Sequence, residues 1–241
     1  MNRESAAELV RAARALSIAV GRIKFEAPAY YVYNPLEYAR LAHELYLNKY
    51  GRNRKRVVFL GMNPGPYGML QTGVPFGEVN FVRQWMDLHA RILKPARSHP
   101  KRPVEGFACK RSEVSGRRLW GLFEGRFESA ANFFRDHFVA NYCPLAFFDR
   151  DARNLTPDKL PTGQTIELFA ACDRHLRCIL ETLQPQWLVG IGGFAAERAR
   201  LVCRETSVSV GRILHPSPAS PAANRNWAEK ATAQLKTLGA W

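Results

Sequence analysis

The sequence predicts an α/β fold, a three-layer α/β/α sandwich with a central four-stranded parallel sheet. Two observations support this fold class. Short apolar runs, each the length of a buried strand, recur along the chain, and amphipathic helical patterns separate them. A strand, helix, strand order is typical of parallel sheets, because parallel strands need crossover connections that a helix usually supplies.

Four apolar runs are the candidate strands. Each is almost continuously apolar, as expected for parallel strands that are covered on both faces. They are RVVFLG at Arg56–Gly61, HFVANYC at His137–Cys143, QWLVGIG at Gln186–Gly192 and VSVGRILH at Val208–His215.

Five segments with helical periodicity complete this pattern, and Thr162 or Thr165 is expected to cap the third of them. They are Glu78–Ile92, Glu128–Phe134, Gln164–Thr182, Phe194–Arg204 and Trp227–Leu238.

The 241 residues fit one domain, residues 1–241, with the N-terminal fifty residues forming helices that pack on it, most clearly at Leu36–Lys49. The long connection between the first two strands contains the basic run Lys110–Arg118, which we expect to be a charged loop able to contact phosphates. Insertions of this size over a sheet commonly carry function.

The composition favours a globular protein that binds nucleic acid. Hydrophobic residues make up 46% of the chain and the formal net charge is +14, which attracts polyanions. No apolar run approaches the roughly 20 residues of a membrane span. The N-terminal segment mixes acidic and basic residues and predicts an amphipathic helix, not a signal peptide. We therefore expect a protein inside the cell without a membrane anchor.

Neither a metal nor a nucleotide cofactor is indicated. The five cysteines form no CxxC pair, and irregular spacing argues against disulfides, structural zinc and iron–sulfur clusters. The segment GIGGF after the third strand lacks the full dinucleotide-binding pattern, and a tight strand-to-helix turn accounts for its glycines.

A rigid loop follows the first strand. Gly61–Met69 contains two prolines and three glycines, which fix an irregular backbone and let a ligand approach closely. Ligands of open parallel sheets bind at the carboxyl ends of the strands. Asn63 is therefore either a functional side chain or a turn cap.

A second stiff segment, His215–Pro221, follows the last strand. Three prolines after His215 keep it extended, and its Ser hydroxyls and main-chain N–H groups suit contact with phosphates. The alternative is a rigid linker to the last helix. Both loops should meet at one edge of the sheet.

Several longer motifs, in this order, resemble the single-strand-selective monofunctional uracil-DNA glycosylases of the uracil-DNA glycosylase superfamily. They are GMNPGPYGMLQTGVPFGE, HPKRPVEGFACKRSEVSGRRLWG, NYCPLAFFD, RNLTPDKLP and HPSPASPAANRNW. The resemblance implies a four-stranded parallel sheet between helices, which agrees with the strands identified above. It also implies a DNA-repair enzyme that flips out uracil or a C5-modified uracil and hydrolyses its glycosidic bond, without metal or cofactor.

The resemblance assigns roles to particular residues. Asn63 is expected to hold the attacking water, and His215 to donate a hydrogen bond to the base O2. Asn141 is expected to read the base and Phe76 to stack on it. Main-chain groups of the first loop complete the pocket, at Met62 and Gly65.

DNA contacts are implied in and after the second loop, where Ala219–Arg225 should wedge into the duplex. The expected contact residues are Pro216, Ser217, Ala219, Ser220, Pro221 and Arg225. Two positions depart from the family pattern, which has glycine where Asn226 stands and phenylalanine where Tyr67 stands. Asn tolerates left-handed backbone, so we expect the last helix to begin normally.

Other functions remain open at this point. A glycosylase of the same fold that prefers hypoxanthine or xanthine is one alternative, and a nucleic-acid-binding module without activity is another. We expect the partner to be single- or double-stranded DNA, the protein to be a monomer, and its location to be cytoplasmic, or nuclear in a eukaryote.

Overall fold

A central sheet of four parallel strands organises the molecule. The structure is a computed structural model that describes residues 3–241. The strand order is β3-β2-β6-β7. Their bounds are β2 Val57–Gly61, β3 His137–Asn141, β6 Trp187–Ile191 and β7 Ser209–Ile213. The predicted fold class is confirmed, and all four predicted strands are present with slightly shorter bounds.

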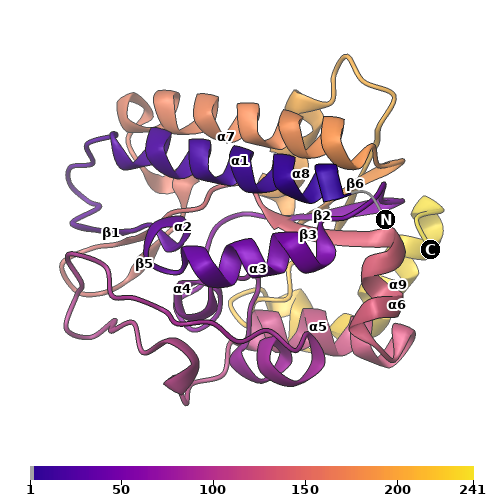
Figure 1. Cartoon of the computed structure of the whole chain (residues 1–241), viewed down its shortest axis with the longest axis horizontal. Helices are drawn as coiled ribbons and strands as arrows, with labels where there is room; N and C mark the ends of the chain where they lie inside the picture. The colour runs from indigo at the N-terminus through magenta and orange to yellow at the C-terminus, as the bar shows by residue number, and fades with distance from the viewer. Residues whose placement is uncertain (1–2) are drawn as a thin grey trace.

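Helices flank both faces of this sheet (Figure 1). On one side lie α1 (Arg3–Gly21), α7 (Thr162–Leu183) and α8 (Gly193–Val202). On the other side lie α5 (Val114–Phe127), α6 (Ala130–Asp136) and α9 (Trp227–Leu238). Every residue of β2 and β3 is buried as a result. This explains why the strands have apolar sequences without alternation.

The helix α8 packs very closely against β6. A Cβ atom built on Gly190 would lie only 2.3 Å from the backbone nitrogen of Ala196. Glycine is therefore required here for the close approach of the helix to the strand. The same turn contains Gly192, whose φ of +94° favours glycine. Packing accounts for Gly190 and turn geometry for Gly192, whereas a Cβ on Gly193 would meet nothing within 4 Å.

Helices at the N-terminus pack against one another and against α7. They are α1, α2 (Pro35–Tyr38) and α3 (Arg40–Tyr50). From α3, the Tyr46 hydroxyl donates to the Val139 carbonyl at 2.8 Å, and its ring lies 5.2 Å from that of Phe138. These contacts attach the helix to β3. Residues Met1 and Asn2 of the predicted helix lie outside the described residues.

A second, antiparallel sheet was not predicted. It has the order β1-β4-β5, with β1 at Tyr31–Tyr33, β4 at Ala146–Phe148 and β5 at Asn154–Leu155. Strands of two or three residues are too short to show a period-2 pattern. They form because Tyr33 and Phe148 pack against each other, with ring centroids 5.2 Å apart.

The connection between β2 and β3 differs from the prediction. The expected helix at Glu78–Ile92 is reduced to a π-helix at Phe81–Trp85, and the following residues are irregular. The Glu78 carboxylate accepts from the Asn80 and Phe81 amides, and Asp87 adopts a φ of +48°, which ends the helix. In contrast, the basic run at 110–118, expected as a loop, enters helix α5.

Short helices fill the remaining connections, and one expected cap is absent. Helix α7 begins at Thr162 after Pro161, and its cap makes no side-chain hydrogen bond, so neither threonine caps it. The short elements are α4 at Met69–Thr72 and 3-10 turns at Gly106–Ala108, Pro157–Lys159 and Pro221–Ala223.

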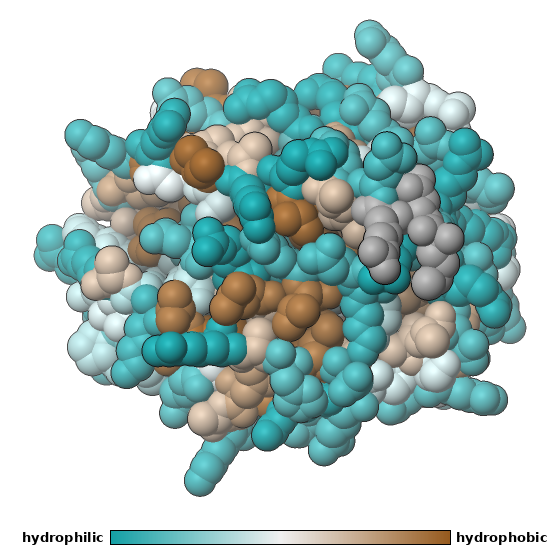
Figure 2. Space-filling model, in the orientation of Figure 1, coloured by the Kyte–Doolittle hydropathy of each residue, from teal (hydrophilic) through white to brown (hydrophobic). Residues whose placement is uncertain are grey.

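The face of the molecule seen in Figure 2 is mostly hydrophilic. Figure 2 shows one face, where apolar side chains gather near α3, and Leu41 and Leu45 of that helix are exposed. Within residues 3–241, no helix has the length and apolar character of a membrane span, and no group of His, Cys, Asp or Glu is arranged to hold a metal. All five cysteines are free thiols.

The close packing at Gly190 is open to a direct test. Gly190→Ala should lower the free energy of unfolding by about 1–3 kcal/mol, because the new methyl group meets backbone that cannot rotate away. Urea denaturation measures this change. The matched control is Gly125→Ala in α5, where a Cβ meets nothing within 4 Å and stability should rise by roughly 0.5–1 kcal/mol. Equal effects at both positions would contradict the close approach.

Candidate active site

The carboxyl ends of the four parallel strands meet at one edge of the sheet. Gly61 pairs with Asn141 across β2 and β3, and Ile191 pairs with Ile213 across β6 and β7. The first loop and His215 therefore emerge side by side, as the sequence predicted. Between them lies a cleft of about 680 Å³. Its walls come from the first loop, the start of α5, the second sheet and the second loop.

Backbone hydrogen bonds hold the first loop beside the end of β3. The Tyr142 amide donates to the Gly61 carbonyl at 2.9 Å, and the Cys143 amide donates to the Met62 carbonyl at 2.8 Å. The side chain of Asn63 is oriented as well, because its Nδ2 donates to the Leu145 carbonyl at 3.2 Å. This bond leaves the Asn63 Oδ1, an acceptor, for the cleft.

His215 is held as a neutral donor. The Ser217 amide donates to its Nδ1 at 3.1 Å, so the ring proton resides on Nε2. Burial lowers the pKa of His215 to about 4, which keeps the imidazole uncharged at neutral pH. The ring packs on Gly192, where a Cβ would lie 3.2 Å from the His215 Cβ. Glycine at that turn therefore makes room for the imidazole.

Phe76 and Asn141 form the inner wall of the cleft. Phe76 has a φ of +53°, and its carbonyl accepts from the Trp120 Nε1 at 3.0 Å. Its ring lies 6.2 Å from that of His215. Gly61 allows both wall residues to fit, since a Cβ there would lie 2.3 Å from the Asn141 Oδ1 and 2.5 Å from the Phe76 ring.

One expected phosphate contact is used inside the protein instead. The Arg118 guanidinium donates to the Pro216 carbonyl at 2.8 Å, and so α5 holds the second loop in place. The loop also closes on itself, because the Ala219 amide donates to the Ser217 hydroxyl at 3.1 Å. Of the basic run, Arg111 does line the cleft, with its guanidinium 4.3 Å from the centre of the Tyr67 ring.

Comparison with known proteins agrees with this arrangement. A family model described as the uracil DNA glycosylase superfamily matches residues 48–237. The chain belongs to the uracil DNA glycosylase superfamily.

Curated relatives place it within one branch of that superfamily. A single-strand selective monofunctional uracil-DNA glycosylase from Rattus norvegicus is 45% identical over 226 residues, which are 93% of this chain and 81% of the relative. A protein of the same name from Bos taurus is 47% identical over 210 residues, 86% of this chain and 77% of the relative. The crystal structure of the SMUG2 protein of Pedobacter heparinus shares the fold, with a TM-score of 0.65 at 16% identity over 95% of this chain and 99% of that one.

The glycosylase cleft contains most of the predicted site residues. Its walls include Met62, Asn63, Gly65, Phe76, Asn141, His215 and Ser217. Pro216 of the second loop is buried. Ala219, Pro221 and Arg225 are exposed and Ser220 is half-buried, and all four lie outside the cleft walls.

Both departures from the family pattern are accommodated. Asn226 adopts left-handed backbone, with φ 52° and ψ 43°, and α9 begins at Trp227 as predicted. The added hydroxyl of Tyr67 lies in the cleft wall and accepts from the Arg102 guanidinium at 2.5 Å. This hydroxyl therefore ties the first loop of the glycosylase to the segment that precedes α5.

Glu113 lines the cleft, and the sequence analysis did not identify it. Its carboxyl group fills the space that Gly65 and Gly68 leave open, since a Cβ on either glycine would lie less than 2.5 Å from a carboxylate oxygen. Burial raises its pKa to about 7, although the facing amides of Tyr67 and Gly68 lower it. The Oε2 atom has no hydrogen bond of ordinary geometry. Glu113 lies within the basic run 110–118, which the sequence predicted to be a charged loop, so nothing in the local pattern indicated this buried position.

The raised pKa of Glu113 predicts a pH-dependent loss of stability. The folded state binds this proton more tightly than the unfolded state, whose pKa is near 4.5, so the cost of ionising the group grows as the pH rises from 4.5 through 7. Glu113→Gln removes that cost. The variant should gain stability over the parent by an amount on the order of 2–3 kcal/mol at pH 8, and nothing comparable at pH 4.5.

Urea unfolding at a series of pH values measures this difference. The control is Glu167→Gln on the exposed side of α7, which removes a carboxyl group that the protein does not enclose. A pH-independent difference for Glu113→Gln would show that the carboxyl titrates alike in the folded and unfolded chains.

Proposed function

We propose that this glycosylase flips uracil out of DNA and hydrolyses its N-glycosidic bond, leaving an abasic site. One observation carries the proposal. The open oxygen of Asn63 and the neutral Nε2–H of His215 line the same cleft, beside the aromatic wall of Phe76. An acceptor for water on one side and a donor for a departing anion on the other are the groups that this cleavage needs.

The base enters the inner end of the cleft. Phe76 offers its ring for stacking, and Asn141 lies beside it, fixed opposite Gly61. The Asn141 Oδ1 accepts from uracil N3–H while its Nδ2 donates to O4. Cytosine presents an acceptor and a donor in the reverse order, so it leaves unpaired polar groups in the site. Main-chain groups of Met62 and Gly65 complete the wall.

Bond cleavage precedes water attack in this mechanism. As the bond between C1′ of the sugar and N1 of the base breaks, its electron pair moves onto the base, and His215 Nε2–H donates to O2 as negative charge develops. A neutral imidazole suits this role, because His215 stays uncharged near pH 7 and still donates a hydrogen bond through Nε2–H. The cation-like sugar then bonds to the water on Asn63 Oδ1, and that water loses a proton to solvent.

The attacking water does not need a base to deprotonate it before it reacts. The carboxamide of Asn63 cannot remove a proton, but an electron-poor sugar needs a positioned nucleophile and not a strong one. Among the described residues that line the cleft there is no lysine. An amine nucleophile that could open the sugar and break the strand is therefore missing from these walls, which favours monofunctional chemistry.

The second loop contacts DNA around the flipped nucleotide. Extruding a base costs a few kcal/mol of lost stacking and pairing, which protein contacts must offset. The exposed residues Ala219, Pro221 and Arg225 follow Ser217 out of the cleft and are placed to enter the gap and meet the backbone. Ser220 lies with them, and Pro216 supports them from beneath. Arg111 adds a positive charge at the cleft wall.

A labelled oligonucleotide with one uracil tests the function. After incubation, strand breaks should occur only when alkali is added, since alkali cleaves abasic sites. The substrate should be offered single-stranded and in duplex. Breaks without alkali would indicate lyase chemistry. Release of hypoxanthine or xanthine with uracil left intact would instead support the purine alternative.

Two variants test the assigned roles. Asn63→Ala and His215→Ala should each slow single-turnover excision by about 10²–10³-fold, since each removes a group that acts on the transition state. Both should retain DNA binding, measured by fluorescence anisotropy. Ser207→Ala, an exposed residue just before β7 and outside the cleft, is the control and should leave both binding and the chemical step unchanged. Weaker binding with unchanged chemistry would refute the assignments.

The range of substituents at C5 gives a further prediction. A water near the first loop can bond to a hydroxymethyl group, whereas the methyl group of thymine displaces it without replacing its hydrogen bonds. Excision of 5-hydroxymethyluracil should therefore be within about tenfold of uracil, and thymine should be removed far more slowly. Gas-phase or liquid chromatography of the released bases measures all three. Equal release of thymine and uracil from the same duplex would sink the prediction.

A further inference from the structure

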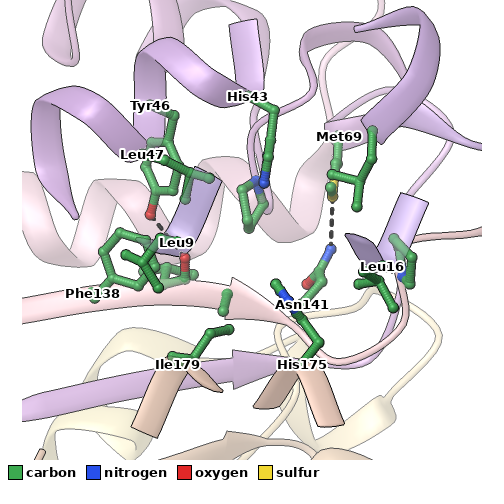
Figure 3. A pocket seen from close by; sticks show the side chains of 15 residues that line it. Leu9, Leu16, His43, Tyr46, Leu47, Met69, Phe138, Asn141, His175 and Ile179 are labelled. Carbon is green, nitrogen blue, oxygen red and sulfur yellow. Dashed lines mark hydrogen bonds between the residues drawn. The ribbon is translucent and has the colours of Figure 1, made fainter. Parts of the chain in front are cut away.

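The side-chain amide of Asn141 lies between the cleft and the interior of the protein. The residue is 9% exposed and lines both the cleft and a small internal cavity of about 30 Å³ (Figure 3). An amide can be turned over by 180°, which exchanges its donor with its acceptor. In one orientation its acceptor and donor face the N3–H and O4 of uracil. In the other orientation they face the N3 and amino group of cytosine. The choice of base therefore depends on what holds the amide in one orientation.

The partner of this amide is the sulfur of Met69. The Asn141 Nδ2 donates to the Met69 Sδ at 3.2 Å, and Figure 3 shows the two side chains pointing toward one another. A thioether sulfur accepts hydrogen bonds but has no hydrogen to donate. If the amide turned over, the lone pairs of Oδ1 would face the lone pairs of sulfur. The contact therefore favours one orientation and disfavours the other.

The remaining polar atoms of the amide make no hydrogen bond to the protein within residues 3–241. The NH₂ group has two hydrogens, and the sulfur takes one of them, so the second remains for the base O4. Within residues 3–241, the Asn141 Oδ1 is buried without a hydrogen-bond partner. A buried acceptor without a partner costs free energy in the empty protein, and under the proposed role of Asn141 it gains one when uracil N3–H meets it.

Two other polar groups around the cavity are bonded elsewhere, whereas the buried His175 Nδ1 has no hydrogen-bond partner among residues 3–241. The Tyr46 hydroxyl donates to the Val139 carbonyl at 2.8 Å, and the His43 Nδ1 lies 2.8 Å from the Gly73 carbonyl. His175 also lines the cavity, and burial lowers its pKa to about 4, so it is neutral. Met69 is fixed in turn, because it is only 2% exposed and begins α4 directly after the first loop.

We propose that Met69 is a positioning residue whose sulfur sets the orientation of the Asn141 amide and thereby the preference for uracil over cytosine. This rests on the proposed role of Asn141 in reading the base. Met69 acts through Asn141 and does not itself need to touch the base. A leucine of similar volume would fill the same space without accepting a hydrogen bond, and both orientations of the amide would then become accessible.

Binding to DNA that cannot be cleaved provides the test. A 2′-fluoro sugar resists glycosidic cleavage, so 2′-fluorodeoxyuridine and 2′-fluorodeoxycytidine can be placed at the same position of one oligonucleotide. The readout is the ratio of the two dissociation constants. Met69→Leu should reduce the preference for uracil about fivefold, through weaker uracil binding and stronger cytosine binding. The matched control is Met86→Leu, a fully buried methionine outside both pockets, which should leave the ratio unchanged.

A second measurement isolates the sulfur from any effect on folding. Norleucine replaces the sulfur of methionine by CH₂ with little change in shape, and the chain has four methionines. Norleucine-containing parent protein should show the same loss of preference as Met69→Leu. Norleucine-containing Met69→Leu should show no further loss, which excludes a contribution from the other methionines.

The outcomes separate this proposal from the one on which it rests. If Asn141→Ala abolishes the preference for uracil but Met69→Leu and norleucine leave it unchanged, the role of Met69 is refuted and that of Asn141 stands. If Asn141→Ala also leaves the preference unchanged, the base-reading role of Asn141 is wrong. Loss of binding to both bases in Met69→Leu, with the norleucine protein behaving like the parent, would show a packing role and overturn the proposal.

Discussion

The parallel register between β2 and β3 is the constraint on which the rest of the site depends. It places Gly61 opposite Asn141 at the ends of the two strands. A slip of one residue would turn Asn141 to the other face of the sheet and bring a side chain against the Phe76 ring. The ladder continues into the first loop through the bond from the Cys143 amide to the Met62 carbonyl. The backbone thus positions the loop before any side chain contributes.

Three of the polar side chains that line the cleft share one arrangement. In each, the protein binds one polar atom and leaves the other for a ligand: Asn63 by its Nδ2, His215 by its Nδ1 and Asn141 by its Nδ2. Each group is neutral, so it can be held in a partly buried site without the cost of a buried charge. Fixed neutral dipoles need little reorganisation when charge develops during a reaction.

Prediction from the sequence succeeded where a local pattern is long and specific. The apolar runs identified the four central strands, and the proline- and glycine-rich loops identified the edge at which Asn63 and His215 meet. It failed where tertiary contacts decide. The second sheet depends on packing between Tyr33 and Phe148, and the helix expected from Glu78 ends early. The Glu113 carboxyl occupies space beside Gly65 and Gly68, which are far from it in the sequence. None of these contacts leaves a periodic signal in the chain.

The bond from Arg118 to the Pro216 carbonyl changes how the positive charge of this protein should be interpreted. A guanidinium already engaged with a carbonyl still adds to the long-range field that draws DNA toward the surface, but it is not free to replace a counterion on a phosphate. All basic residues therefore contribute to the long-range attraction of DNA, but only those with a free charged group can contact its phosphates. The net charge of +14 sets how fast DNA is found, whereas a smaller group of side chains sets how steeply salt weakens the bound complex.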